Sequence, residues 1–188
     1  MNTDIKTLLE QVQSGSVSVA DAMGILKDQP FADLGYAKVD LHRQVRQGAS
    51  EVIYGAGKTA EQITGILRAM AENGQKNVLI TRVDPEKAAA VNACFPICYH
   101  PESRLAIAGS LPAPTGIGTI VVATGGTSDI PVAEEAALTA EFLGNQVERL
   151  YDVGVAGLHR LLSHRQELME ASVVIAIAGM EGALATVI

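Results

Sequence analysis

The segment 124–129, TGGTSD, gathers groups that could bind or transform an anionic ligand. Gly125 and Gly126 lack side chains, so a ligand can approach the backbone closely there. Thr127 and Ser128 add hydroxyl groups, and Asp129 adds a carboxylate. An apolar run precedes the segment and a helix-like run follows it, so the backbone amides of a helix start would also face the ligand. The segment is therefore a candidate binding turn.

An ordinary turn between a strand and a helix would use the same residue types. Asp129 could serve as the N-cap of the helix, with Pro131 in the first turn, where its missing N–H costs nothing. The GGTSD pattern taken alone does not separate this structural role from ligand binding.

Two later segments repeat the arrangement of a strand, glycines and titratable side chains. YDVGVAGLHR contains Asp152, His159 and Arg160, and AGMEGA places Glu181 between two glycines at an expected helix start. Glu181 could simply complement the helix dipole, and His159 could be a surface histidine. Together with Asp129, however, these residues predict a cleft formed by Asp129, Asp152, His159 and Glu181, because ligands bind at the carboxyl ends of parallel strands.

The elements that would position this cleft follow an alternating pattern. GTIVVAT, QVERLYDVG and SVVIAIAG are expected strands, and IPVAEEAALTAEFLG, GLHRLLSHRQELMEA and MEGALATVI are expected helices. Strands that alternate with helices indicate a parallel sheet. We expect this domain to span residues 114–188. Three strands make a thin sheet, so we also expect the domain to be incomplete at its carboxyl end.

Two further units precede this domain. Apolar spacing predicts a helical hairpin over residues 1–30, and residues 31–113 predict a small mixed α/β domain. In the latter, Thr59 and Gln62 form a capping box for a helix that Gly74 ends. The preceding GAGKT lacks the spacing of a Walker motif, although its backbone amides could still hold a phosphate. A Pro/Gly-rich segment, 109–118, marks the domain boundary.

Composition narrows the class of protein. The 188 residues are 48% hydrophobic, 19% charged and 4% aromatic, with a formal net charge of −7. This balance favours an α/β protein and argues against nucleic acid or an anionic membrane as a partner. No secretion signal opens the chain, and prolines and glycines interrupt its long uncharged stretch, so a cytoplasmic protein is expected. Cys94 and Cys98 have no second ligand pair for zinc and are expected to be buried or incidental thiols.

These motifs also carry a family resemblance. GGTSD before a helix and AGMEGALA after an apolar strand are similar to the carboxylase domain of PurE-type aminoimidazole ribonucleotide carboxylases. With EVIYGAGKT, DVGVAGLHRL and VVIAIAGMEGALATV added, residues 31–188 resemble the LarB family of nickel-pincer nucleotide cofactor biosynthesis. The resemblance implies a PurE-like parallel three-layer sandwich after the small mixed α/β domain and the helical hairpin.

The resemblance further implies an activity. LarB-like enzymes carboxylate carbon 5 of the pyridinium ring of nicotinic acid adenine dinucleotide and hydrolyse its phosphoanhydride, giving pyridinium-3,5-biscarboxylic acid mononucleotide and AMP. A thiolate added at carbon 4 would make the electron-poor ring nucleophilic at carbon 5. No bound cofactor is firmly implied. Carbon dioxide or bicarbonate is the co-substrate, a role for Mg²⁺ stays open, and a homo-oligomer is expected, as an octamer or its dimers.

The matching motifs imply site residues. Ser128 and Asp129 would lie beside the reacting ring, and Glu181 would assist hydrolysis as a general base or metal contact. The expected substrate-binding residues are Gly125, Gly126, Thr127, Asp152, His159, Gly179 and Gly182, with Lys58, Thr81, Arg82 and His100 from the first α/β unit. Lys58 and Arg82 could equally be plain surface charges.

The sequence departs from the family pattern at the nucleophile. The family's nucleophilic cysteine follows the segment that matches AGMEGALATV, and neither Cys94 nor Cys98 matches that position. We therefore expect these 188 residues alone to be inactive or weakly active. An aminoimidazole ribonucleotide carboxylase and a non-catalytic nucleotide-binding module are the alternative functions.

Overall fold

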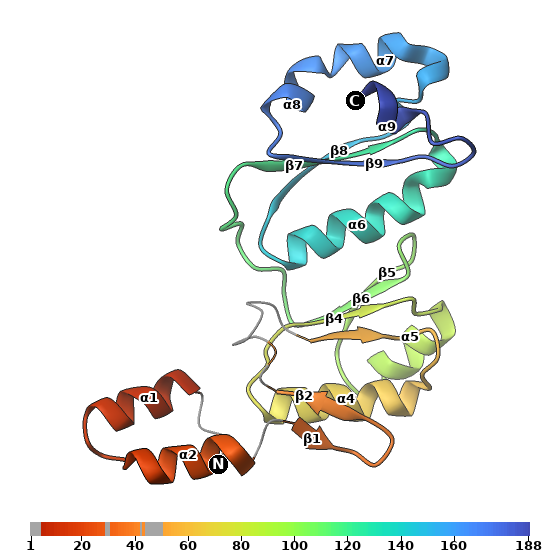
Figure 1. The fold of residues 1–188 in the computed structure, drawn as a ribbon. Helices are drawn as coiled ribbons and strands as arrows, with labels where there is room; N and C mark the ends of the chain where they lie inside the picture. The colour runs from red at the N-terminus through yellow and green to blue at the C-terminus, as the bar shows by residue number, and fades with distance from the viewer. Residues whose placement is uncertain (1–4, 29–30, 42, 44–50) are drawn as a thin grey trace.

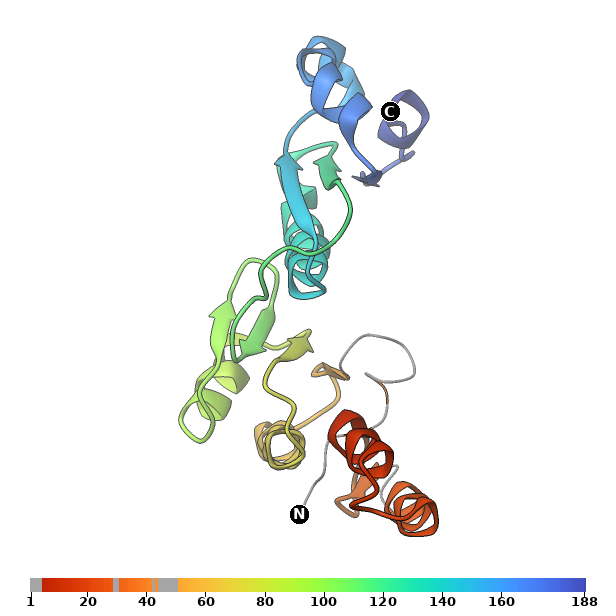
Figure 2. The same ribbon diagram turned by 90° about the vertical axis from the view of Figure 1, so that its left-hand side faces the viewer.

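The computed structural model describes residues 5–28, 31–41, 43 and 51–188. These described residues form an α/β protein with a helical hairpin at one end and three β-sheets, of two, four and three strands, beyond it (Figures 1 and 2). The two larger sheets lie on opposite sides of one helix, α6 (Ile130–Phe142).

The hairpin consists of α1 (Ile5–Gln13) and α2 (Val19–Asp28). Gly15 takes a φ of 77° between them, a left-handed conformation that glycine adopts without strain. Ser18 caps α2, since its hydroxyl accepts a hydrogen bond from the backbone N–H of Asp21 at 3.1 Å. Leu8 and Ala22 are buried in this hairpin. The helices that the apolar spacing predicted are confirmed.

The first α/β unit contains a four-stranded sheet of order β3-β4-β6-β5. Its elements, with the small antiparallel β1–β2 pair that precedes them, are β1 (Phe31–Asp33), β2 (Lys38–Asp40), β3 (Val52–Tyr54), α4 (Ala60–Glu72), β4 (Val78–Thr81), α5 (Pro85–Asn92), β5 (Cys98–His100) and β6 (Leu105–Ala108). Helix α4 connects the parallel strands β3 and β4, and β5 and β6 extend the sheet as antiparallel strands. The predicted capping box of Thr59 and Gln62 begins α4.

The second unit contains a parallel three-stranded sheet of order β8-β7-β9. Its elements are β7 (Thr119–Thr124), α6, β8 (Gln146–Leu150), α7 (Leu158–Ser163), α8 (Arg165–Glu170), β9 (Val173–Ile177) and α9 (Leu184–Val187). The helices α7, α8 and α9 cover one face of the sheet, and α6 covers the other (Figure 1). The alternating strands and helices predicted for this region are confirmed.

Helix α6 is buried on two sides. Ala133 and Ala137 pack against Val122 of the three-stranded sheet. Leu138 and Phe142 pack instead against residues of β4 and β6 in the first unit. The small alanines let the helix lie close to one sheet, and the larger side chains fill the space toward the other. The two units therefore share a core through α6.

Two local predictions were wrong, and one of the two alternatives for the cysteines is excluded. The single helix expected over GLHRLLSHRQELMEA is two helices, α7 and α8, interrupted at His164. Glu181 does not lie at a helix start, because α9 begins only at Leu184. Of the two alternatives for Cys94 and Cys98, buried or incidental thiols, burial is excluded, because the turn after α5 and the edge strand β5 leave both side chains exposed. No described helix is long and apolar enough to cross a membrane.

Candidate functional site

The carboxylate of Asp129 lies at the end of the central strand β7. After this strand, Gly126 begins a short 3₁₀ turn, 127–129, that leads into α6. Oδ2 of Asp129 accepts a hydrogen bond from the backbone N–H of Gly126 at 3.0 Å. Asp129 occupies the N-cap position of α6, as the sequence allowed, but its carboxylate makes no capping hydrogen bond to the helix amides and bonds to the strand end instead. Pro131 lies in the first turn of α6, as predicted.

The end of β9 borders the same carboxylate. The backbone N–H of Gly125 donates to the carbonyl of Ile177 at 2.9 Å, which joins the two strand ends. A Cβ added at Gly125 would lie 3.1 Å from Cβ of Ala178 and 3.4 Å from Oδ2 of Asp129. A Cβ at Gly179 would lie 3.6 Å from Oδ1 of Asp129. The two glycines thus leave the surroundings of this carboxylate free of side chains.

The loop after β8 is fixed to the other side of β7. The backbone N–H of Asp152 donates to the hydroxyl of the buried Thr124 at 2.9 Å, and the N–H of Val153 donates to the Thr124 carbonyl at 2.9 Å. Gly154 lies so close to the carbonyl oxygen of Gly125 that a Cβ there would collide with it. Asp152 adopts a φ of 57°, which is uncommon outside glycine. The loops after all three strands therefore meet around residues 124–126.

Other predicted members are exposed. Thr127 and Ser128 lie with Asp129 on the 3₁₀ turn, His159 lies in the first turn of α7, and Glu181 lies on the loop after β9. Gly182, with a φ of 66°, completes the turn that carries Glu181. Among the described residues, no hydrogen bond or ion pair connects Glu181 or His159 with Asp129.

The residues predicted from the first unit lie at different places. Arg82 follows β4 and donates from Nε to Oε1 of Glu135 on α6 at 3.1 Å. His100 ends β5 and is close enough to Glu134 on α6 to affect its pKa. The backbone N–H of Lys58 donates to the Gly55 carbonyl at 3.2 Å, within the GAGKT turn. Arg82 and His100 thus face α6 near its second turn, whereas Lys58 contributes to the turn before α4.

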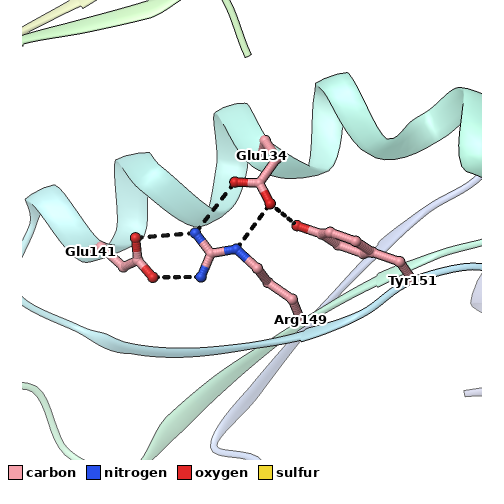
Figure 3. A network of polar contacts seen from close by, with 4 residues as sticks. All are labelled: Glu134, Glu141, Arg149 and Tyr151. Carbon is pink, nitrogen blue, oxygen red and sulfur yellow. Dashed lines mark hydrogen bonds and ion pairs between the residues drawn. The ribbon is translucent and has the colours of Figure 1, made fainter. Parts of the chain in front are cut away.

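A polar network that the sequence patterns did not predict joins α6 to β8 and the residue after it (Figure 3). The guanidinium of Arg149 binds Glu134 through Nε and Nη2, at 3.0 and 3.3 Å, and Glu141 through Nη1 and Nη2, at 2.6 and 3.1 Å. The hydroxyl of Tyr151 donates to Oε1 of Glu134 at 2.6 Å. Glu134 and Glu141 are seven residues apart on a helix, so they share one face, and this spacing was the available signal.

The network perturbs the titration of its members. Burial alone would raise the pKa of Glu134, but the hydrogen bonds from Tyr151 and Arg149 lower it below its usual value. Burial, together with the bond to Glu134, raises the pKa of Tyr151. Glu134 is therefore ionised and Tyr151 neutral at neutral pH. Because Tyr151 immediately precedes Asp152, the network also anchors the start of the loop that reaches Thr124.

The described residues contain no group of three or more His, Cys, Asp or Glu side chains arranged to hold a metal ion. The chemistry that this arrangement offers is that of one accessible carboxylate, Asp129, among glycines and backbone amides. Such a group can accept a proton from a bound ligand or orient one.

Comparison with known proteins identifies related sequences. Residues 31–110 match the model of the LarB/PurE-like N-terminal domain. The whole chain is 34% identical over 197 aligned residues to an uncharacterized protein of Methanocaldococcus jannaschii, of which the alignment covers 77%.

Proposed function

Because this chain belongs to the LarB/PurE-like family, we propose that it acts in the carboxylation of the pyridinium ring of nicotinic acid adenine dinucleotide. The products are pyridinium-3,5-biscarboxylic acid mononucleotide and AMP. The observation that carries the proposal is the place of Asp129, whose carboxylate lies among Gly125, Gly126 and Gly179 at the ends of two parallel strands. A carboxylate bordered by glycines, which carry no side chain, suits a flat ring that must approach it closely.

Asp129 has a defined role in this reaction. Once carbon 5 of the activated ring has bonded to carbon dioxide, that carbon still carries a hydrogen. The Asp129 carboxylate accepts this hydrogen as a proton, and the electron pair of the broken C–H bond returns to the ring. The hydrogen bond from Gly126 orients the carboxylate through one oxygen and leaves its other oxygen, Oδ1, toward Gly179.

Glu181 takes a second role in the proposal. It lies on the exposed turn after β9, next to the glycines that border Asp129. A carboxylate there can activate water for hydrolysis of the phosphoanhydride once substrate is bound. A PurE-like three-layer arrangement and a homo-oligomer belong to the same proposal.

Ligand binding tests the proposal. We expect nicotinic acid adenine dinucleotide to raise the melting temperature of the protein and aminoimidazole ribonucleotide to leave it unchanged. The opposite pattern would favour an aminoimidazole ribonucleotide carboxylase, and protection by neither compound would contradict both enzymatic assignments.

Variants of Asp129 separate chemistry from binding. Asp129→Asn retains an oxygen that can accept the Gly126 hydrogen bond but cannot take up the ring proton. With a small thiol added in solution to activate the ring at carbon 4, we expect this variant to bind the dinucleotide but to lose the exchange of the carbon 5 hydrogen with deuterated solvent that NMR detects for the unaltered protein. Glu86→Gln, which removes an exposed charge from α5, serves as the control. Equal exchange in both variants would exclude Asp129 as the base.

A further inference from the structure

The first α/β unit contains a pocket that the proposed function does not use. It lies between the carboxyl end of α4, the start of β4, the end of β6 and the turn after α5, and its volume is about 360 Å³. Small-molecule sites have volumes of about 300–1,000 Å³. The walls of this α4 pocket are mostly apolar, with two polar side chains among them, and include Leu67, Ala71, Phe95, Ala108, Gln75 and Lys76.

The α4 pocket lies away from Asp129. Val78 pairs with Ala108, so the start of β4 and the end of β6 meet at one end of the sheet. Arg82, which is bonded to α6, follows the opposite end of β4. Val78 and Ala108 belong to the core on the α4 face of the sheet, whereas Leu79 packs against α6. The pocket is therefore on the face and at the end of the sheet that are remote from the Asp129 site.

The side-chain amide of Gln75 lacks hydrogen bonds in this pocket. Nε2 and Oε1 are both buried, and among the described residues neither atom has a hydrogen-bond partner. The backbone N–H of Gln75, by contrast, donates to the carbonyl of Met70 at 3.0 Å in the turn that ends α4. Buried polar groups are nearly always paired, because an unpaired one destabilises the folded state. The amide thus lacks a partner that offers an acceptor and a donor side by side.

The chemistry of the missing partner indicates the kind of ligand. Adenine presents a donor beside an acceptor, in its amino group and N7, and glutamine binds this edge in DNA recognition. The O6 and N7 edge of guanine presents two acceptors and does not match an amide. The aromatic side chain of Phe95 in the wall favours a flat ring that can stack. The exposed Lys76 favours a phosphate attached to that ring through a sugar.

We propose that the α4 pocket binds the adenine ring of a nucleotide such as AMP, with the amide of Gln75 bonded to the ring and the ammonium group of Lys76 paired with the phosphate. The free amide has no hydrogen bond to lose when it turns toward the ring. A Cβ added at Gly74 would meet no atom within 4 Å, so there is space beside Gln75 for this rotation. The inference is independent of the proposed function, because the pocket shares no residue with the Asp129 site.

Calorimetry with adenosine and purine riboside tests the contact with Gln75, because the two compounds differ only by the amino group of adenine. We expect the unaltered protein to bind adenosine about tenfold or more tightly than purine riboside, and AMP more tightly than adenosine. Gln75→Leu should abolish the first preference, and Lys76→Ala should abolish the second. Gln13→Leu, which replaces an exposed glutamine of α1, is the matched control.

Two further measurements separate a ligand contact from a structural role. Gln75→Leu replaces an unpaired amide with an apolar group of similar size, so the free variant should melt at a higher temperature than the unaltered protein. AMP should raise the melting temperature of the unaltered protein but not that of the variant. Ala71→Leu places a larger side chain at an exposed position of the wall and should weaken the binding of adenosine and purine riboside alike.

Several outcomes would refute the inference. These are no binding of adenosine or AMP to the unaltered protein, an adenosine preference in Gln75→Leu equal to that in Gln13→Leu, or cytidine bound as tightly as adenosine. A melting temperature of free Gln75→Leu below that of the unaltered protein would also refute it, because the amide would then already be paired. Nicotinic acid mononucleotide, which lacks adenine, reports on the Asp129 site alone, and its failure to bind would count against the proposed function only.

Discussion

Replacement of Arg149 by methionine tests whether the α6–β8 network stabilises the fold. The side chain of Arg149 is 29% exposed, and those of its partners Glu134 and Glu141 are 18% and 24% exposed. Arg149→Met would leave two carboxylates facing each other without a cation. The loss of free energy of unfolding should exceed that for breaking an exposed ion pair, about 0–1 kcal/mol. It should stay below that for breaking a fully buried pair, about 3–5 kcal/mol.

A destabilisation of about 2 kcal/mol follows from this intermediate burial. For a protein of this size it corresponds to a fall of about 4–8 °C in the melting temperature. The assay is thermal unfolding followed by circular dichroism at neutral pH. Arg68→Met, which removes an exposed arginine from α4, is the matched control and should change the melting temperature little.

The difference in stability between the unaltered protein and Arg149→Met should also depend on pH. In the unaltered protein the pKa of Glu134 lies below its usual value of 4.5, so its stabilising effect is present above that value and is lost as pH falls through the lowered pKa. Without Arg149 the guanidinium no longer lowers the pKa of Glu134, although the hydrogen bond from Tyr151 still does, so this pKa should be higher in the variant than in the unaltered protein. The difference between the two proteins should therefore shrink as pH falls toward about 4.

Two results would refute this reasoning. One is a loss of less than about 1 °C at neutral pH, which would place the network among surface ion pairs of negligible effect. The other is a loss that stays the same at acidic pH, which would attribute it to packing of the arginine side chain rather than to the two carboxylates. Glu134→Gln and Glu141→Gln, introduced together into Arg149→Met, should recover stability in neutral buffer.

Three smaller predictions concern other contacts. Thr124→Val removes the hydroxyl that accepts the N–H of Asp152, and urea titration should show a loss of about 1 kcal/mol; an unchanged midpoint would mean that water replaces the hydroxyl. Gly154→Ala places a methyl group against the carbonyl of Gly125, so we expect a loss of about 1–3 kcal/mol by the same titration, and a neutral effect would show that the loop moves freely. Thr59→Ala removes the cap of α4 and should cost about 1 kcal/mol, partly restored by Thr59→Ser; equal stability of Thr59→Ala and the unaltered protein would contradict the cap.

Local patterns predicted most secondary structure because their causes lie within a few residues. The capping box of Thr59 and Gln62, the stop at Gly74 and the apolar spacing of α1 act through neighbouring atoms along the chain. The break at His164 was not predicted, since the apolar and charged residues of 158–170 suit one helix equally well.

The candidate site was predictable in part. The rule that ligands bind at the carboxyl ends of parallel strands points to Asp129 and its glycines from the sequence alone. The direction of its carboxylate depended on the 3₁₀ turn, which no residue pattern indicated. The pairing of Asp152 with Arg160 was also missed, because it requires the path of the loop after β8.

By itself, the sequence determined most of the strands and helices, that β7, β8 and β9 run parallel, and that glycines and acids gather at their ends. These features depend on side-chain periodicity and on backbone freedom, both of which are local properties. Only the tertiary structure decided that α6 lies between two sheets, that Arg149 joins two glutamates, and that Asp152 is fixed to Thr124. Those contacts join residues distant in the chain, and their geometry exists only when the sheets have packed.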